Sequence, residues 1–302
     1  TICFTDNVLP LSVCRKLFNN LAGLKMDFKF FAEVRAIISE SIIKQMKNAG
    51  LEELQIGIEA LSTSLLRRMN KGTRVIDNIQ IMKICEMYGI VNASNLLIQF
   101  PQSTVAEVEE TLENLEFVRP FRPLRPVRFW LGLESPVWCN PKKHGLSVIF
   151  NHPNYRYLFP SSLINQLTFT IQGYRGDIQA QRLLWKPVVK KVNQWRKDYM
   201  QMVHHGSGKP LLHFRDGRTF LIIEQHRPND DPLKHRLTSN SRKIYLFCQK
   251  PRSFKRISSK FSYLSQENIQ TFLNVMVSKR LMFEEKECYL SLAVPLRIKS
   301  AK

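Results

Sequence analysis

The stretch ELQIGIEAL, residues 53–61, joins an apolar run to a glycine and then to a carboxylate, Glu59. The pattern predicts a strand over residues 54–60, and a serine and a helix follow from residue 62. A charge at the carboxyl end of a buried strand is costly unless something uses it. Ligands bind at that end of the strands in α/β barrels, so the stretch indicates a binding site in an α/β fold.

Strand and helix patterns alternate on both sides of this stretch, over the first 135 residues. Strands separated by single helices form parallel βαβ units with right-handed crossovers. Five strands are too few for a closed eight-stranded barrel, so a doubly wound sheet and a partial barrel both fit. The predicted strands are residues 1–7, 29–36, 54–60, 92–100 and 127–133. The predicted helices are residues 11–22, 39–49, 62–70, 75–88 and 104–118.

The pattern changes after residue 135. Residues 136–204 are predicted to form a loop-rich cover followed by one long helix at 177–202. Two glycines near residues 205–209 indicate a boundary to a third unit, residues 205–302. The elements predicted in that unit are a hairpin (211–215 and 219–225), a strand (234–238), helices (about 241–250, 252–261 and 265–279) and a second hairpin (281–284 and 288–294).

Charge is unevenly distributed along the 302 residues, whose net charge is +20. Residues 1–150 hold 18 basic and 15 acidic side chains, whereas residues 201–302 hold 19 and 8. A basic module suits nucleic acid, an acidic peptide or a membrane surface, or it only keeps the protein soluble. No apolar run reaches the roughly 18 residues that span a bilayer, so we expect no membrane partner. Six scattered cysteines without CxxC spacing suit free thiols, and we expect a cytoplasmic protein with no metal ligands in this chain.

Polar side chains follow the ends of four successive predicted strands. Residues two apart in a strand share a face, so the members of each strand point the same way. Several polar groups at equivalent depths suggest a shared pocket, although a structural ion pair between Glu33 and Arg35 together with strand-end caps is an alternative. The series consists of Asp6, Asn7, Glu33, Arg35, Glu59, Asn95 and Gln99. No Gly-rich phosphate loop, HExxH or GxSxG motif accompanies it, and we assign no catalytic residue.

Short motifs in a fixed order resemble those of radical S-adenosylmethionine (SAM) enzymes, most closely the branch with an upstream cobalamin-binding domain. They are FTDN (4–7), EVRA (33–36), MKNAGL (46–51), GIEA (57–60), NKGT (70–73) and FP (100–101). Further on, FWLG (129–132), SPVW (135–138) and FNHP (150–153) resemble the subgroup that matures ribosomally made peptides, known as RiPPs.

This resemblance implies an α/β fold: a partial (β/α)6 TIM-like barrel, here residues 1–135 without its first strand, followed by a small α+β winged-helix-like domain. It also implies a [4Fe-4S] cluster and SAM, with cobalamin as a further cofactor of this branch. The CxxxCxxC loop that ligates the cluster is absent, so we expect it upstream of residue 1, in an amino-terminal part that this chain lacks. Without that loop, the chain alone is expected to be inactive.

The resemblance also assigns the strand-end residues as cofactor-binding. Asp6 and Asn7 would lie beside the methionine part of SAM, and Glu33 and Arg35 would line the pocket. Glu59 would bond the amino or ribose groups, and the strand that carries Asn95 and Gln99 would pass the adenine. The sequence departs from the family pattern at Gln99 and at Gln102-Ser103, where many relatives have Gly and Gly-Glu.

The basic unit resembles the RiPP recognition element, a small winged domain that holds the leader of a precursor peptide as an added strand. A winged helix-turn-helix that contacts phosphates through Lys255, Arg256 and Lys260 is the less favoured alternative, and plain structural packing is a third. We therefore expect a radical SAM enzyme that modifies a ribosomally made peptide. The alternatives are a non-catalytic peptide- or nucleic-acid-binding module with a degenerate barrel, and a tRNA methylthiotransferase-like enzyme. Methylation, epimerisation and cyclisation are all compatible with the sequence.

Overall fold

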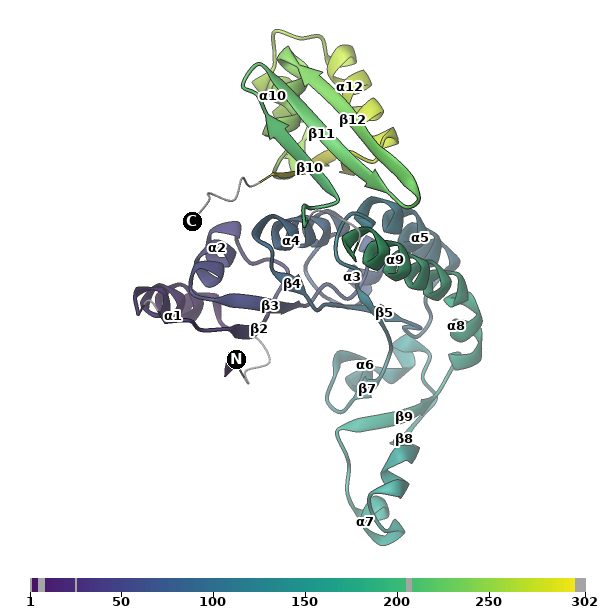
Figure 1. Cartoon of the computed structure of the whole chain (residues 1–302). Coiled ribbons are helices and arrows are strands. Elements are labelled where there is room, and N and C mark those ends of the chain that lie inside the picture. The colour runs from purple at the N-terminus through teal and green to yellow at the C-terminus, as the bar shows by residue number, and fades with distance from the viewer. Residues whose placement is uncertain (1, 5–8, 25, 205–207, 297–302) are drawn as a thin grey trace.

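A parallel β-sheet forms the amino-terminal half of the chain in the computed structural model, which describes residues 2–4, 9–24, 26–204 and 208–296 (Figure 1). Five parallel strand positions occur in the predicted order, with the fourth divided in two. The strands are β1 (Ile2–Cys3), β2 (Phe30–Val34), β3 (Leu51–Ile56), β4 (Val91–Asn92), β5 (Asn95–Ile98) and β6 (Arg125–Arg128). The structure therefore confirms a mixed α/β fold with a parallel sheet.

A local break separates β4 from β5. β4 pairs with β3, whereas β5 pairs with β6, and an isolated parallel bridge joins Glu59 to Leu96. At the break, the Ser94 hydroxyl accepts a hydrogen bond from the backbone N–H of Ile56 at 3.0 Å. The Ser94 hydroxyl takes the place of a backbone carbonyl as acceptor. The buried N–H of Ile56 is therefore paired although the strand pairing is interrupted here.

Five helices follow the strands and bury one face of the sheet. The buried strand residues alternate with half-exposed ones, so Ala32, Val34 and Leu54 lie in the core while Phe31 and Glu33 do not. The helices are α1 (Leu11–Gly23), α2 (Glu40–Asn48), α3 (Thr63–Arg68), α4 (Val75–Tyr88) and α5 (Val105–Val118). The opposite face of the sheet carries the half-exposed side chains, and we call it the open face.

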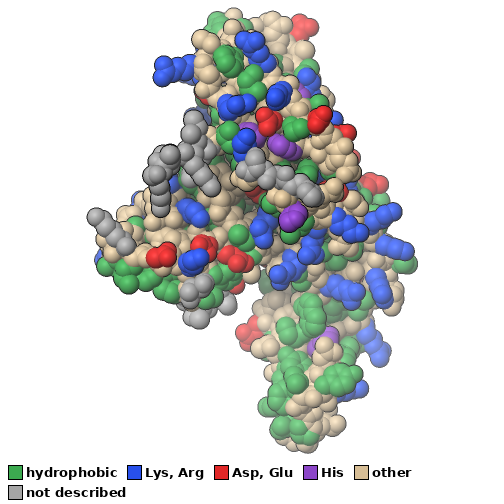
Figure 2. Space-filling view, in the orientation of Figure 1, with side chains coloured by type: hydrophobic (Ala, Val, Ile, Leu, Met, Phe, Trp, Pro, Cys, Tyr) green, Lys and Arg blue, Asp and Glu red, His purple; other side chains and the backbone are tan. Residues whose placement is uncertain are grey.

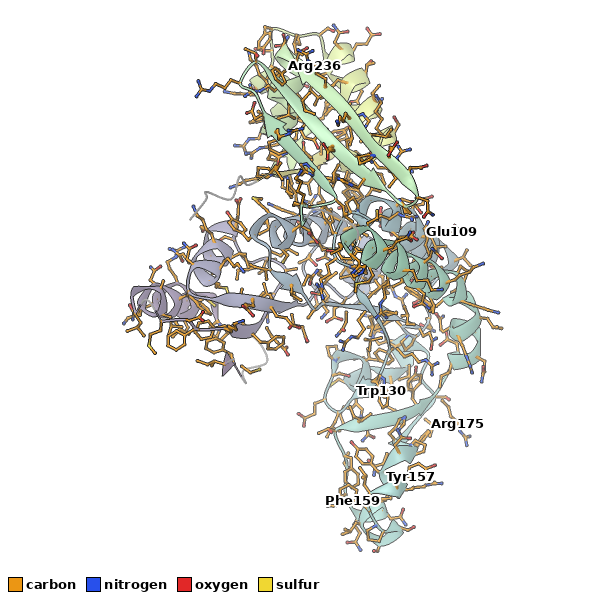
Figure 3. All side chains as sticks on the ribbon, viewed as in Figure 1. Glu109, Trp130, Tyr157, Phe159, Arg175 and Arg236 are labelled. Atoms are coloured by element: carbon orange, nitrogen blue, oxygen red, sulfur yellow. The ribbon has the colours of Figure 1, made fainter. Side chains whose placement is uncertain are left out.

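Residues 131–175 form an extension that the sequence did not reveal. The expected loop-rich cover contains a three-stranded antiparallel sheet in the order β7-β9-β8, with strands too short to show a period. Its elements are β7 (Leu131–Gly132), α6 (Pro136–Cys139), η1 (Pro141–His144), β8 (Val148–Asn151), η2 (Pro153–Tyr157), α7 (Ser161–Gln166) and β9 (Ile171–Arg175). Figure 3 places Trp130 where the parallel strands meet this extension, and Tyr157 and Phe159 near its far end.

Two helices, α8 (Ile178–Leu184) and α9 (Lys186–His204), replace the single long helix expected at 177–202. Trp185 lies between them, fully buried, and its indole N–H donates to the Gln181 side chain at 3.2 Å. The predicted apolar stripe of α9 is buried against α5. Exposed Lys and Arg side chains cover its other face, where they gather in the space-filling view (Figure 2).

The carboxyl-terminal residues form two small sheets with three helices behind them, and the predicted elements are all present. The first sheet has the order β12-β11-β10-β16 and the second β13-β15-β14. The strands are β10 (Leu212–Asp216), β11 (Phe220–Arg227), β12 (Asp230–Thr238), β13 (Arg252–Ser253), β14 (Met282–Glu285), β15 (Cys288–Ser291) and β16 (Val294–Pro295). The helices are α10 (Ser239–Phe247), α11 (Phe254–Lys260) and α12 (Gln266–Ser278).

Polar contacts join these carboxyl-terminal elements to the parallel sheet's helices. The Glu285 carboxylate accepts a hydrogen bond from the Thr63 hydroxyl and another from the backbone N–H of Ile76 at 2.9 Å. It therefore caps the positive N-terminal end of α4. On the same helix, Lys83 is buried and its ammonium donates to the backbone and side-chain oxygens of Gln249 at 2.9 and 2.8 Å. Within the described part of the chain, no helix is long and apolar enough to cross a membrane.

Candidate functional site

The open face of the parallel sheet carries the predicted polar residues. Glu33, Glu59, Asn95 and Gln99 are half-exposed and alternate with buried neighbours, as the parity argument predicts, and Arg35 is exposed beyond the end of β2. Asp6 and Asn7 lie outside the described residues. The structure thus brings side chains of β2, β3 and β5 to one face.

Glu59 follows β3, which ends at Ile56, and has a strained backbone conformation. Its φ is +58°, a left-handed value that is uncommon for residues other than glycine. Its carboxylate accepts a hydrogen bond from the ammonium of Lys71 at 3.2 Å, and 26% of the Glu59 side chain is exposed. Its carbonyl accepts from the N–H of Leu97 at 2.7 Å, which ties it to β5. Strain that the surrounding structure maintains is typical of binding sites.

Asn78, on α4, holds this strand end from behind. Its side-chain amide donates to the carbonyls of Ile58 and Ala60, both at 2.9 Å, and the residue is fully buried. The two bonds fix the backbone on each side of Glu59. Asn78 therefore determines the position from which the Glu59 side chain extends. Sequence reasoning missed Asn78, although its position between the apolar residues Ile76 and Ile79 and next to the buried face of the helix was a signal that a buried partner exists.

Gln99 and Gln102 both adopt left-handed backbone conformations, with φ of +62° and +55°. These are two of the positions where the sequence departs from glycine in the resemblance above. The backbone therefore keeps a glycine-like path although the side chains differ. Arg68 stabilises the turn between them, because its guanidinium donates to the carbonyls of Pro101 at 2.8 Å and Gln102 at 3.0 Å.

Arg68 and Glu59 each form an ion pair, whereas the pair expected between Glu33 and Arg35, both of which the structure describes, is not formed. Arg68 also donates to the buried carboxylate of Glu107 at 2.7 Å. Among the residues that the structure describes, no ion pair joins Glu33 to Arg35, so that alternative explanation of the polar series receives no support from the structure.

A cleft of about 370 Å³ adjoins Gln99, between the end of the sheet and the extension. Two arginines from different elements, Arg128 and Arg182, line it together with Trp130 and Tyr174. Burial raises the pKa of Tyr174 to about 12, so its hydroxyl stays protonated and able to donate a hydrogen bond at neutral pH. The cleft combines cationic and aromatic groups, which suits an acidic or aromatic ligand. Sequence reasoning missed these residues because three separate elements bring them together.

Iron–sulfur ligands are not grouped in the described part of the chain. The six cysteines are free and dispersed, and two of them, Cys3 and Cys139, are exposed on different elements. A [4Fe-4S] cluster needs several cysteine thiolates within reach of one another. The described residues therefore do not fit such a cluster.

Comparison with known proteins gives structural matches only. No family model matches the chain, and no curated protein matches it. The radical SAM methyltransferase TsrM from Kitasatospora setae, solved with tryptophan and a SAM analogue, is 13% identical with a TM-score of 0.45, over 64% of this chain and 42% of that one. The cobalamin-dependent SAM radical enzyme OxsB is 19% identical with a TM-score of 0.36, over 47% of this chain and 23% of that one.

A third structural match is coproporphyrinogen III oxidase, HemN, from Escherichia coli, described as a radical SAM enzyme. It is 11% identical with a TM-score of 0.40, over 94% of this chain and 71% of that one. All three matches have TM-scores below 0.5, and the chain spans less than half the length of TsrM and OxsB.

Proposed function

We propose that this chain binds SAM on the open face of its parallel sheet, as part of a radical SAM enzyme that modifies a ribosomally made peptide. The observation that carries the proposal is the pair of strand ends at Glu59 and Gln99. Both residues have left-handed backbones, both face the open side, and Gln99 borders the cleft. With a [4Fe-4S] cluster, SAM supplies the radical chemistry of that family.

In this proposal, different residues of the polar series bind different parts of SAM. The Glu59 carboxylate can accept hydrogen bonds from the amino or ribose hydroxyl groups of SAM, while Lys71 keeps that carboxylate oriented at 3.2 Å. Asn95 and Gln99 offer side-chain amides on the same face for the adenine. Glu33 on β2 and Arg35 just beyond it continue this polar face. We assign Asp6 and Asn7 to the methionine end of SAM on the resemblance alone.

The substrate would enter through the cleft beside Gln99. Its arginines and aromatic side chains suit a peptide residue that is acidic or aromatic, which agrees with a peptide substrate. Cobalamin is part of the proposal as a cofactor of the resembling branch. The reaction itself, whether methylation, epimerisation or cyclisation, is left open by the geometry.

The carboxyl-terminal sheet supports a role in holding the leader of a precursor peptide. β12 lies at the edge of its sheet, is nine residues long and is largely exposed. An extended peptide can add to such an edge through main-chain hydrogen bonds. The basic charge of this unit favours an acidic leader. Nucleic acid remains the alternative partner, because Lys255, Arg256 and Lys260 are exposed on α11.

Binding of SAM to the purified chain tests the proposal directly. Isothermal titration should show binding that Glu59→Gln weakens by about 10- to 100-fold, since a hydrogen bond to a charged group contributes roughly 1.5–3 kcal/mol. Glu52→Gln is the matched control, because Glu52 lies on the same strand but pairs with Lys29 on the surface. Equal affinity of both variants, or no binding by the chain, would reject the assignment of Glu59.

A second titration separates the partners. The chain is titrated with an acidic leader-like peptide, a duplex DNA and a tRNA at several salt concentrations. Binding of the peptide, lost on substituting proline for Leu233 in β12, supports leader recognition, because proline removes a main-chain donor from a strand. Tight binding of DNA or tRNA alone, with a steep salt dependence, would instead favour the nucleic-acid module or the tRNA-modifying enzyme.

A further inference from the structure

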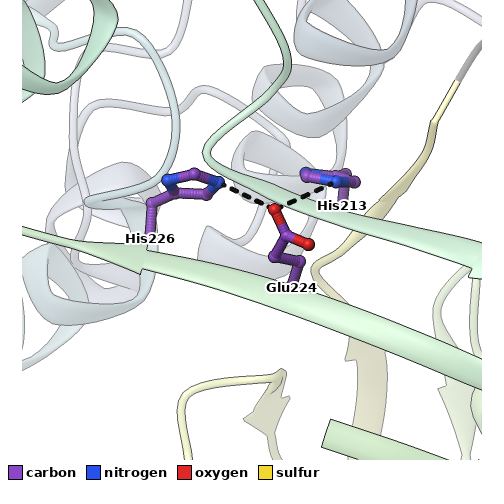
Figure 4. A group of neighbouring side chains, drawn as sticks. All are labelled: His213, Glu224 and His226. Atoms are coloured by element: carbon purple, nitrogen blue, oxygen red, sulfur yellow. Dashed lines mark ion pairs between the residues drawn. The ribbon is translucent and has the colours of Figure 1, made fainter. Parts of the chain in front are cut away.

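Two histidines and one glutamate meet on the β10–β11 hairpin. His213 lies on β10, and Glu224 and His226 lie on β11, with His213 directly opposite Glu224 in the antiparallel register. One ligand atom from each residue lies within 4.8 Å of the others (Figure 4). The Glu224 Oε1 atom is 3.4 Å from Nε2 of His226 and 3.9 Å from Nε2 of His213.

The protonation of His213 is determined by its second ring nitrogen. Its Nδ1 lies 2.8 Å from the carbonyl oxygen of Pro210, which can only accept a hydrogen bond. Nδ1 must therefore carry the proton in the neutral ring, and Nε2 presents its lone pair to Glu224. The ring is 1% exposed. An imidazole that donates Nδ1–H to a backbone carbonyl is the usual arrangement behind a metal-bound Nε2.

His226 and Glu224 also direct atoms toward the space between the three side chains. Nε2 of His226 is buried and has no hydrogen-bond partner within the described part of the chain. Arg215 faces the second carboxylate oxygen, Oε2, at 3.8 Å, so Oε1 is left directed at both imidazoles. Two imidazole nitrogens therefore converge on one carboxylate oxygen in a largely buried place, an arrangement that a cation bound among the three atoms would stabilise.

We propose that His213, Glu224 and His226 bind a divalent transition metal ion of the Zn²⁺ class, through Nε2, a carboxylate oxygen and Nε2. Bonds of about 2.0–2.1 Å to a tetrahedral Zn²⁺ place neighbouring ligand atoms roughly 3.3 Å apart. The observed 3.4 and 3.9 Å approach that spacing, and small side-chain rotations bring the third pair together. Two imidazoles and one carboxylate suit this class of ion, and the fourth position stays open to water.

The ion would fasten the start of the carboxyl-terminal unit. It would join β10 to β11, and through the Pro210 carbonyl it would also hold the segment that leads into β10. A metal bound only by the folded hairpin would stabilise the folded state by an amount that grows with the logarithm of its concentration relative to its dissociation constant.

Metal titration of the whole chain, purified without a polyhistidine tag and stripped with chelator, tests the proposal. Co²⁺ should bind with one equivalent and give d–d absorption of a tetrahedral nitrogen–oxygen site, without the thiolate bands that cysteine ligands produce. Glu224→Gln and His226→Gln should each weaken Co²⁺ and Zn²⁺ binding by at least about 10- to 100-fold, the range produced even by loss of an outer-shell partner. Zn²⁺ should raise the Tm of the unaltered chain but not of these variants.

His235→Gln is the matched control. His235 lies on the same sheet opposite Ile223, on the face that carries Gln225 rather than Glu224, and its Nε2 lies 3.1 Å from the Gln225 side chain. This variant should bind metal like the unaltered chain. Circular dichroism verifies folding, and Glu224→Gln, which preserves shape, serves if His226→Gln fails to fold. Absent binding, thiolate bands, or equal binding by all variants would overturn the proposal.

Discussion

Replacing Asn78 by aspartate tests how the fold holds Glu59 in place. The two side chains have nearly the same shape, but aspartate lacks the amide that donates to the carbonyls of Ile58 and Ala60. In the variant, one carboxyl oxygen would replace the amide nitrogen and face both carbonyl oxygens in a fully buried position. Destabilisation should therefore follow from the lost hydrogen bonds and not from a change in volume.

The magnitude follows from the two bonds. Each typical hydrogen bond contributes about 1 kcal/mol net, and a buried group left unpaired costs roughly 1–3 kcal/mol. The Ile58 carbonyl keeps one other donor, the N–H of Ala60 at 2.7 Å, so its penalty is at the low end. We expect Asn78→Asp to lower the free energy of unfolding by about 2–4 kcal/mol. Because Glu59 lies between the two carbonyls, the proposed binding of SAM should weaken as well.

Asn114 provides a matched comparison. Its amide donates to a single carbonyl, that of Leu61, at the same distance of 2.9 Å, and the residue is only half-buried. Asn114→Asp should therefore cost about 1 kcal/mol or less in urea-induced unfolding. The reasoning is refuted if Asn78→Asp destabilises no more than Asn114→Asp, or if the folded variant binds SAM as tightly as the unaltered chain.

Three further outcomes are expected from single substitutions, each measured by urea unfolding. Burial lowers the pKa of Lys83 to about 7, so between pH 7 and about 10 the unfolded chain binds one more proton than the folded chain. The free energy of unfolding should therefore rise with pH by up to about 1.4 kcal/mol per unit in this range, and Lys83→Met should flatten that rise. Parallel pH profiles of the two chains would contradict this. Gln99→Gly should raise stability by about 0.5–1 kcal/mol by relieving the left-handed backbone, and a loss would show that the side chain contributes more than the strain. Glu285→Gln should lower stability by about 1–2 kcal/mol because it weakens the cap at the N–H of Ile76, whereas the exposed Glu287→Gln should change it by less than about 0.5; equal effects would argue against the cap.

The resemblance to radical SAM enzymes rests on short motifs, and the structure explains why two departures from them are tolerated. Gln99 and Gln102 stand where glycine is usual, yet both keep the left-handed conformation that glycine adopts easily. The path of the chain at the strand end is therefore retained at some conformational cost. That cost is offset locally, because Arg68 donates to the carbonyls on this turn.

Hydropathy period and turn residues were sufficient to predict the parallel strands, their helices and the shared face of Glu33, Glu59, Asn95 and Gln99, because these depend on neighbours two to four positions apart. The same local rules predicted the β10–β11 hairpin, at residues 211–215 and 219–225. They failed for residues 131–175, whose strands are too short for a period, and for the long helix that breaks at Trp185.

The tertiary structure alone decided which distant residues meet. Asn78 reaches the backbone beside Glu59, Arg128 and Arg182 share a cleft, and His213 meets His226 only because two strands pair in one register. Sequence by itself determined that a carboxylate ends the strand at residue 59 and that its neighbours are polar. Folding decided what holds that carboxylate, because contacts across long sequence separations depend on packing and register, which no local pattern encodes.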